Sequence, residues 1–193
     1  MASFKPGGTE FLTELRKRVG RLAVNSSSAR NMGRSGLIES GQEFLGQTME
    51  LKRLKRGRPE NYPALLNELT HELSKVLRPY VRRGSAWGPA RKFLNIFIRD
   101  AFYDFYLREA YSLGRLEAEL EIPLDSYVGR RLREVEKHLP RWSRVIDLTP
   151  EASAQFQDSA SKVAKRLGTY RVHLDVIYWQ KPASQNGNGM SGA

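Results

Sequence analysis

Apolar side chains recur every three or four residues along most of the chain, and this spacing restricts the fold to helices. The clearest stripe runs through residues 63–82 and consists of Leu66, Leu69, Leu73, Val76, Leu77 and Tyr80. A half-buried strand would instead alternate apolar and polar residues. Because no pair of segments with that alternation is present to form a sheet, the sequence predicts an all-α fold.

Glycine, proline and capping residues divide the stripes into six or seven helices. Thr149, Pro150 and Glu151 are typical of an N-cap, a first helical position and an acidic first turn, and Gly168 is placed to end that helix. A lone strand over residues 170–179 would have no partner, so we expect a helix there. The other expected helices cover about residues 9–22, 37–54, 63–82 and 89–111, and a further helix starts at Asp125 or Ser126 and carries Val128, Leu132, Val135 and Leu139.

The length of 193 residues fits one domain, which we place at residues 1–180 and expect to have two lobes. Residues 181–193 are rich in Gly, Ser and Asn, and we predict a disordered tail. Lys and Arg number 32 against 21 Asp and Glu, which gives a net charge of +11. Such a surplus of positive charge indicates a polyanionic partner, most often nucleic acid.

Several classes of site are excluded by composition. The chain has no cysteine, so disulfides, thiolate catalysis and iron–sulfur clusters are ruled out, and its three histidines lie far apart in the sequence. We therefore expect no metal and no cofactor. No apolar run is long enough to cross a membrane and the N-terminus lacks a signal-peptide core, so we expect a cytoplasmic protein without membrane contact.

The helix expected from Pro89 carries an unusual polar face. Successive residues turn by about 100°, which places five side chains opposite the apolar stripe: Lys92, Asn95, Arg99, Tyr103 and Tyr106. Tyrosines interleaved with cations suit a groove that binds phosphates and stacks bases. The same face also fits an ordinary polar surface packed against a second lobe, and the pattern alone leaves both interpretations open.

The turn from Gly84 to Gly88 joins this helix to the preceding one. Its glycines and the following helix N-terminus are suited to holding one DNA phosphate. Trp87 in the turn and Trp142 further along either stack on a base or fill a core position. The simpler interpretation is a plain turn between two helices.

Asp125 stands where a helix begins. As an N-cap it would stabilise that helix by about 1 kcal/mol. The same carboxylate, if it faces a cleft, stays ionised and stabilises a cationic sugar transition state or activates water. The two roles are compatible.

A Gly-bearing helix–turn–helix, a lysine early in its second helix and the entry Pro123-Leu124-Asp125-Ser126-Tyr127-Val128 together resemble the helix-hairpin-helix superfamily of DNA glycosylases. The wide spacing of Lys92 and Asp125 is closest to the archaeal GO-type branch. Small, basic anti-phage glycosylases of bacteria are also similar. The resemblance covers residues 84–133, and the family's Leu-Pro-Gly-Val-Gly hairpin is replaced here by Gly84-Ser85-Ala86-Trp87-Gly88.

The resemblance implies a fold of two helical lobes with a hairpin near residues 82–92 and a DNA-binding cleft between the lobes. It implies that a modified base is flipped out of double-stranded DNA and excised. Asp125 would be the catalytic carboxylate and Lys92 the Schiff-base lysine. Lys92 lies further from the hairpin than is usual, which leaves lyase activity open. The substrate is 8-oxoguanine in repair or glucosylated hydroxymethylcytosine in defence against phage. The DNA-binding residues it implies are Trp87, Gly88, Arg91, Asn95, Arg99, Tyr103, Tyr106, Arg130, Arg131 and Trp142, with further phosphate contacts from Arg82, Arg83, Arg141 and Arg144.

We expect a monomer that acts without a protein partner. We expect His173 and Asp175 to be structural residues. The alternative to an enzyme is a basic helical protein that binds nucleic acid without catalysis, which needs the positive charge but not Asp125. A third alternative is a protein-interaction module whose basic face is incidental.

Overall fold

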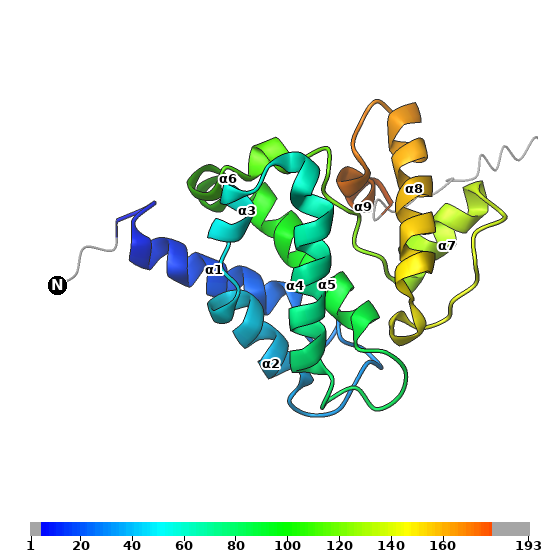
Figure 1. Cartoon of the computed structure of the whole chain (residues 1–193), viewed down its shortest axis with the longest axis horizontal. Coiled ribbons are helices and arrows are strands. Elements are labelled where there is room, and N and C mark those ends of the chain that lie inside the picture. The colour runs from blue at the N-terminus through cyan, green and yellow to red at the C-terminus, as the bar shows by residue number, and fades with distance from the viewer. Residues whose placement is uncertain (1–4, 179–193) are drawn as a thin grey trace, which may run out of the picture.

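Every regular element between residues 5 and 178, the part of the chain that the computed structural model describes, is a helix (Figure 1). The all-α prediction is therefore confirmed for these residues. The predicted tail, residues 181–193, lies outside the described range. In Figure 1 the first three helices lie toward one end of the molecule, and the last three gather at the other.

The N-terminal part consists of α1 (Thr9–Ala23), α2 (Leu37–Glu43), the π-helical turn η1 (Phe44–Thr48), α3 (Lys52–Arg56), the short η2 (Pro59–Asn61) and α4 (Tyr62–Leu77). A single helix over residues 37–54 was expected, and this prediction is wrong. The segment bends because Gly20 and Gly46 bring η1 against α1. A Cβ on Gly46 would lie 3.1 Å from the Cα of Lys17, so this close approach favours glycine.

The long helix expected over residues 89–111 is in fact two helices, α5 (Trp87–Tyr103) and α6 (Phe105–Tyr111). Asp104 separates them because its backbone is extended and its carboxylate accepts a hydrogen bond from the Leu107 amide, at 3.0 Å. Asp104 is thus the N-cap of a new helix. The break changes the direction of the chain, so residues after it do not continue the face of α5.

The C-terminal part contains η3 (Leu113–Leu116), α7 (Ser126–Val135), η4 (Val145–Asp147), α8 (Pro150–Arg166), η5 (Arg171–His173) and α9 (Leu174–Tyr178). The Thr149 hydroxyl accepts from the Ala152 amide at 3.2 Å, and Gly168 has a left-handed backbone, with φ of 68°. Both ends of α8 are therefore as predicted. The helical prediction for residues 170–179 is confirmed through Tyr178.

Buried side chains form two clusters. The larger is built mainly from α1 to α6 and includes Phe93, Phe97 and Phe102, all almost fully buried. The second is built from residues 122–178, around Phe156 of α8. Trp142 packs against both clusters and meets the Phe156 ring edge-on. The aromatic side chain that sequence analysis assigned to a base or to the core thus joins the two clusters.

The turn before α5 is held against the backbone of η4. The Ser85 amide donates to the Ile146 carbonyl at 3.0 Å, and Gly84 adopts a φ of 82°. A Cβ on Gly88 would lie 1.9 Å from the Val145 carbonyl oxygen. The glycines therefore let the start of α5 touch residues 145–146, a use that sequence analysis did not anticipate.

Replacing Gly88 with alanine should destabilise the protein. The new methyl group would overlap the Val145 carbonyl oxygen, and displacing backbone in a packed region costs about 1–3 kcal/mol. Chemical denaturation measures this loss. Gly57→Ala is the matched control, because the nearest atom to its new Cβ is the Arg53 carbonyl oxygen at 3.8 Å and its φ is −75°. Equal stability of the two variants would show that the turn is not constrained in this way.

Candidate active site

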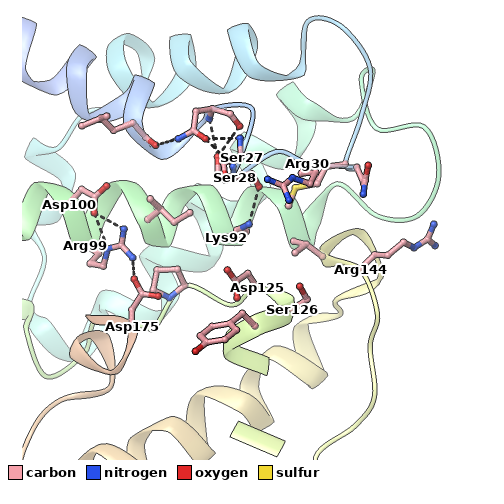
Figure 2. Close-up of a pocket in the computed structure, with 18 of the residues that line it drawn as sticks. Ser27, Ser28, Arg30, Lys92, Arg99, Asp100, Asp125, Ser126, Arg144 and Asp175 are labelled. Carbon is pink, nitrogen blue, oxygen red and sulfur yellow. Dashed lines mark hydrogen bonds and ion pairs between the residues drawn. The ribbon is translucent and has the colours of Figure 1, made fainter. Parts of the chain in front are cut away.

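A cleft of about 810 Å³ lies beside α5 and is lined by segments far apart in the sequence. One wall is the loop after α1, and a second is the polar side of α5. The start of α7, the residues around η4 and the start of α9 complete the lining. Figure 2 shows that Lys92 and Asp125 enter the cleft from opposite sides.

Lys92 lies in the second turn of α5 and is only 8% exposed. Its Nζ donates a hydrogen bond to the Ser28 carbonyl oxygen at 2.9 Å. Burial lowers the pKa of the Lys92 amine, and the carboxylates of Asp125 and Asp175 oppose this shift without cancelling it. The lowered pKa makes the neutral amine, which is the nucleophilic form, more accessible than in an exposed lysine.

Asp125 has the extended backbone of an N-cap, and its Oδ1 accepts from the Val128 amide at 2.8 Å. The capping role predicted from the sequence is therefore confirmed. The residue also lines the cleft, where Figure 2 shows its carboxyl group on the side facing Lys92.

Side chains from two helices fix the extended segment that leads to Asp125. Glu121 accepts a bidentate ion pair from Arg91, with its oxygens 2.8 and 2.7 Å from Nε and Nη2, and a third hydrogen bond from Asn95 at 2.9 Å. Gln157 of α8 binds both the amide and the carbonyl of Ile122. Arg91 and Asn95 were expected to contact DNA; the structure instead buries both and bonds them to Glu121.

Arg99 and Tyr103 do line the cleft, on the same side of α5 as Lys92. The Arg99 guanidinium lies between two carboxylates and forms ion pairs with Asp100 and Asp175. Burial raises the pKa of Asp100, and Arg99 lowers it in opposition. The Tyr103 hydroxyl lies 2.8 Å from Nδ1 of His173.

Two groups of residues in the cleft were missed by sequence analysis. Asp175 was expected to be structural, but it lines the cleft and acts electrostatically on Lys92. The polar loop after α1 supplies Ser28 and Arg30. The run Asn25-Ser26-Ser27-Ser28 is typical of a turn closed by an asparagine side chain, but no local pattern indicates that its carbonyl faces a lysine in α5.

Besides Arg91 and Asn95, six further residues assigned to DNA binding are not part of the cleft lining: Trp87, Gly88, Tyr106, Arg130, Arg131 and Trp142. Gly88 is buried against Val145, as described above, and Trp87 packs on the second cluster with the Arg91 guanidinium 5.6 Å from its ring centre. Tyr106 follows the break at Asp104 and packs edge-on against Phe11.

Arg130 and Arg131 are exposed on α7. Arg131 forms an ion pair with Glu134 and lies over the Tyr178 ring. Arg30 and Arg144 line the cleft itself (Figure 2). Arg82, Arg83 and Arg141 are exposed in the two loops that the contact between Ser85 and Ile146 brings together. Arg144 forms an ion pair with Asp147, so the positive charge on and beside the cleft comes mainly from the other four arginines.

Within residues 5–178 no group of three or more His, Asp or Glu side chains is arranged to hold a metal ion. None of the described helices is long and apolar enough to span a membrane. No protein-family model, curated protein or solved structure matches the chain.

Replacing Lys92 with methionine should stabilise the protein at neutral pH. The folded-state pKa of Lys92 lies below its usual value of 10.5, so the folded protein is penalised for holding a charged amine. Met fills similar space without charge, and we expect a gain of about 1 kcal/mol, or ~2–4 °C in Tm.

The gain should be largest below the lowered pKa of the folded protein. It should shrink as the pH rises toward the ordinary lysine value, because the neutral amine then carries no penalty. Thermal denaturation over this pH range checks both points. A Lys92→Met variant that is less stable at every pH would contradict the burial argument.

Proposed function

We propose that the protein is a DNA glycosylase that excises a modified base from double-stranded DNA. The observation that supports this most is the meeting of Lys92 and Asp125 in one cleft, since a buried amine with a lowered pKa and a fixed carboxylate suit cleavage of a glycosidic bond through a covalent intermediate. In this proposal the two clusters of buried side chains are the cores of two lobes, and DNA binds between them.

The carboxylate of Asp125 would stabilise positive charge on the sugar as the bond between C1′ and the base breaks. The bonding electron pair leaves with the base nitrogen, which then takes up a proton from water. Lys92 would form a bond to C1′ through its lone pair, and the sugar ring opens to give a protonated Schiff base. Water hydrolyses this species and restores the amine, leaving an abasic site.

The charge around the cleft supports DNA as the partner. Arg30 and Arg144 line the cleft, and Arg82, Arg83 and Arg141 lie in neighbouring loops, so a phosphate backbone crossing the opening would meet several guanidinium groups. Such contacts release counterions and give salt-dependent affinity. The target nucleotide must leave the stack to reach Lys92, at a cost of a few kcal/mol.

A purely DNA-binding protein would need the arginines but would gain nothing from a buried lysine. Burial of an amine costs free energy, and side chains with perturbed pKa values cluster at functional sites. The cleft chemistry therefore favours the enzyme over the non-catalytic alternative. The base release experiment below determines whether the excised base is 8-oxoguanine, glucosylated hydroxymethylcytosine or another modified base.

Replacing Asp125 with asparagine should abolish base release while the fold and DNA affinity are retained. Asn is as good an N-cap as Asp, so α7 is preserved and only the charge is lost. We expect base release to fall by about 100-fold or more. Mass spectrometry of bases freed from a panel containing unmodified DNA, 8-oxoguanine DNA, uracil DNA and glucosylated phage DNA measures it.

Asp104→Asn is the matched control. Asp104 caps α6 through a hydrogen bond of the same kind but is not part of the cleft lining, so this variant should release base at the normal rate. If the unsubstituted protein frees no base from any DNA and only binds it, the proposal fails and the non-catalytic binder is correct.

A further inference from the structure

The loop between α1 and α2 contains a turn closed by one side chain. Oδ1 of Asn25 accepts hydrogen bonds from the amides of Ser27 and Ser28, at 2.9 and 3.0 Å. Its Nδ2 donates to the Leu22 carbonyl at 2.7 Å. Asn25 therefore ties the residues that follow it back to the last turn of α1.

Further hydrogen bonds hold the same turn from its other side. The Ser28 hydroxyl donates to the Ala23 carbonyl at 2.9 Å and accepts from the Asn25 amide at 2.9 Å. Gln42 of α2 donates to the Val24 carbonyl at 2.7 Å. The amide of Ala29, which shares a peptide plane with the Ser28 carbonyl, donates to the Asn25 carbonyl at 2.9 Å, so this peptide has a fixed orientation. Its carbonyl oxygen is the atom that accepts from Nζ of Lys92.

This contact matters because a lysine side chain has a flexible four-carbon stem. Burial restricts the stem but does not set the direction of the amine. A hydrogen bond to one fixed carbonyl occupies one N–H and thereby restricts where the lone pair of the neutral amine points. For a nucleophile, a misplacement of about 1 Å can cost about 100-fold in rate.

We propose that Asn25 is a positioning residue for Lys92, acting through the Ser28 carbonyl oxygen. The inference rests on the proposed function, in which Lys92 is the nucleophile. Asn25 is not a catalytic residue, because its side chain bonds to the backbone of its own turn. Its role is to hold the acceptor that orients the reacting amine.

Other charges that face Lys92 come from different elements and are unaffected by this turn. Asp125 at the start of α7 and Asp175 of α9 act on the amine directly. Arg99 of α5, Arg30 of the loop and Arg144 beside η4 line the same cleft. Asn25 also lines the cleft but carries no charge. Asn25→Ala leaves all five charges in place, so an altered behaviour of Lys92 in that variant reports on the Ser28 contact.

The test compares Asn25→Ala with Asn25→Asp in the full-length protein. Asp retains the acceptor oxygen for the Ser27 and Ser28 amides, whereas Ala retains none of the three hydrogen bonds. Duplex DNA with a preformed abasic site is the probe, because it requires no knowledge of the excised base. The Lys92 amine condenses with the C1′ aldehyde and releases water, and borohydride then reduces the imine to a stable amine cross-link.

We expect Asn25→Ala to lower the rate of cross-linking at saturating DNA about tenfold or more, with DNA affinity changed less than about twofold. Asn25→Asp should recover most of the lost rate. Asn61→Ala, at an exposed asparagine that precedes α4 without a side-chain capping bond, should match the unsubstituted protein. Loss of affinity in place of rate, or failure of Asp to rescue, would overturn the inference.

A measurement without DNA separates this inference from the proposed function. Brief treatment with acetic anhydride, followed by peptide mass spectrometry, reads the reactivity of Lys92 relative to exposed lysines. Freed from Ser28, the amine should acetylate several-fold faster in Asn25→Ala but not in Asn25→Asp. If the protein forms no cross-link at all, the proposed nucleophile is wrong, yet this ratio still decides whether Asn25 holds Lys92. An unchanged ratio refutes the positioning role.

Discussion

The buried ion pair between Arg91 and Glu121 is the interaction on which the rest of the structure depends. Both side chains are about nine-tenths buried, and the guanidinium also donates to Asn67 and Thr70 of α4. One cation therefore joins α4, α5 and the extended segment that leads to α7. Removing one partner of such a pair leaves an uncompensated buried charge, at a cost of about 3–5 kcal/mol. The segment before Asp125 cannot move without breaking it.

Arg91 and Lys92 are neighbours in α5 but have different roles, because successive residues of a helix point about 100° apart. Arg91 points to Glu121 and holds the fold together, whereas Lys92 points into the cleft and bonds to the loop after α1. Glu121 in turn lies four positions before Asp125. The contact that secures the fold thus also fixes the separation of the two groups to which we assign the chemistry, and rigid placement of that kind is what a reacting pair requires.

The sequence correctly predicted the start of two helices that begin with an N-capping side chain. The start of α8 at Thr149 and that of α7 at Asp125 follow from residues within one turn. The break at Asp104 was missed, although Asp is a good N-cap, because the apolar stripe continues past it. Arg91 and Asn95 were misassigned because their partner lies about 30 residues away, and no periodicity indicates such a contact. Lys92 and Asp125 were singled out by resemblance, and their shared cleft is a property of the tertiary structure alone.

The state of Lys92 depends on a balance to which Arg99 contributes. Asp125 and Asp175 each favour the charged amine, and without other charges two carboxylates in a shielded cleft would hold it protonated. Arg99 forms ion pairs with Asp175 and Asp100. Because the guanidinium is permanently charged, it offsets part of the attraction between the Asp175 carboxylate and the Lys92 amine. Burial of the amine then outweighs what remains. A cleft that holds three carboxylates can in this way still lower the pKa of its lysine, because one guanidinium pairs with two of the carboxylates.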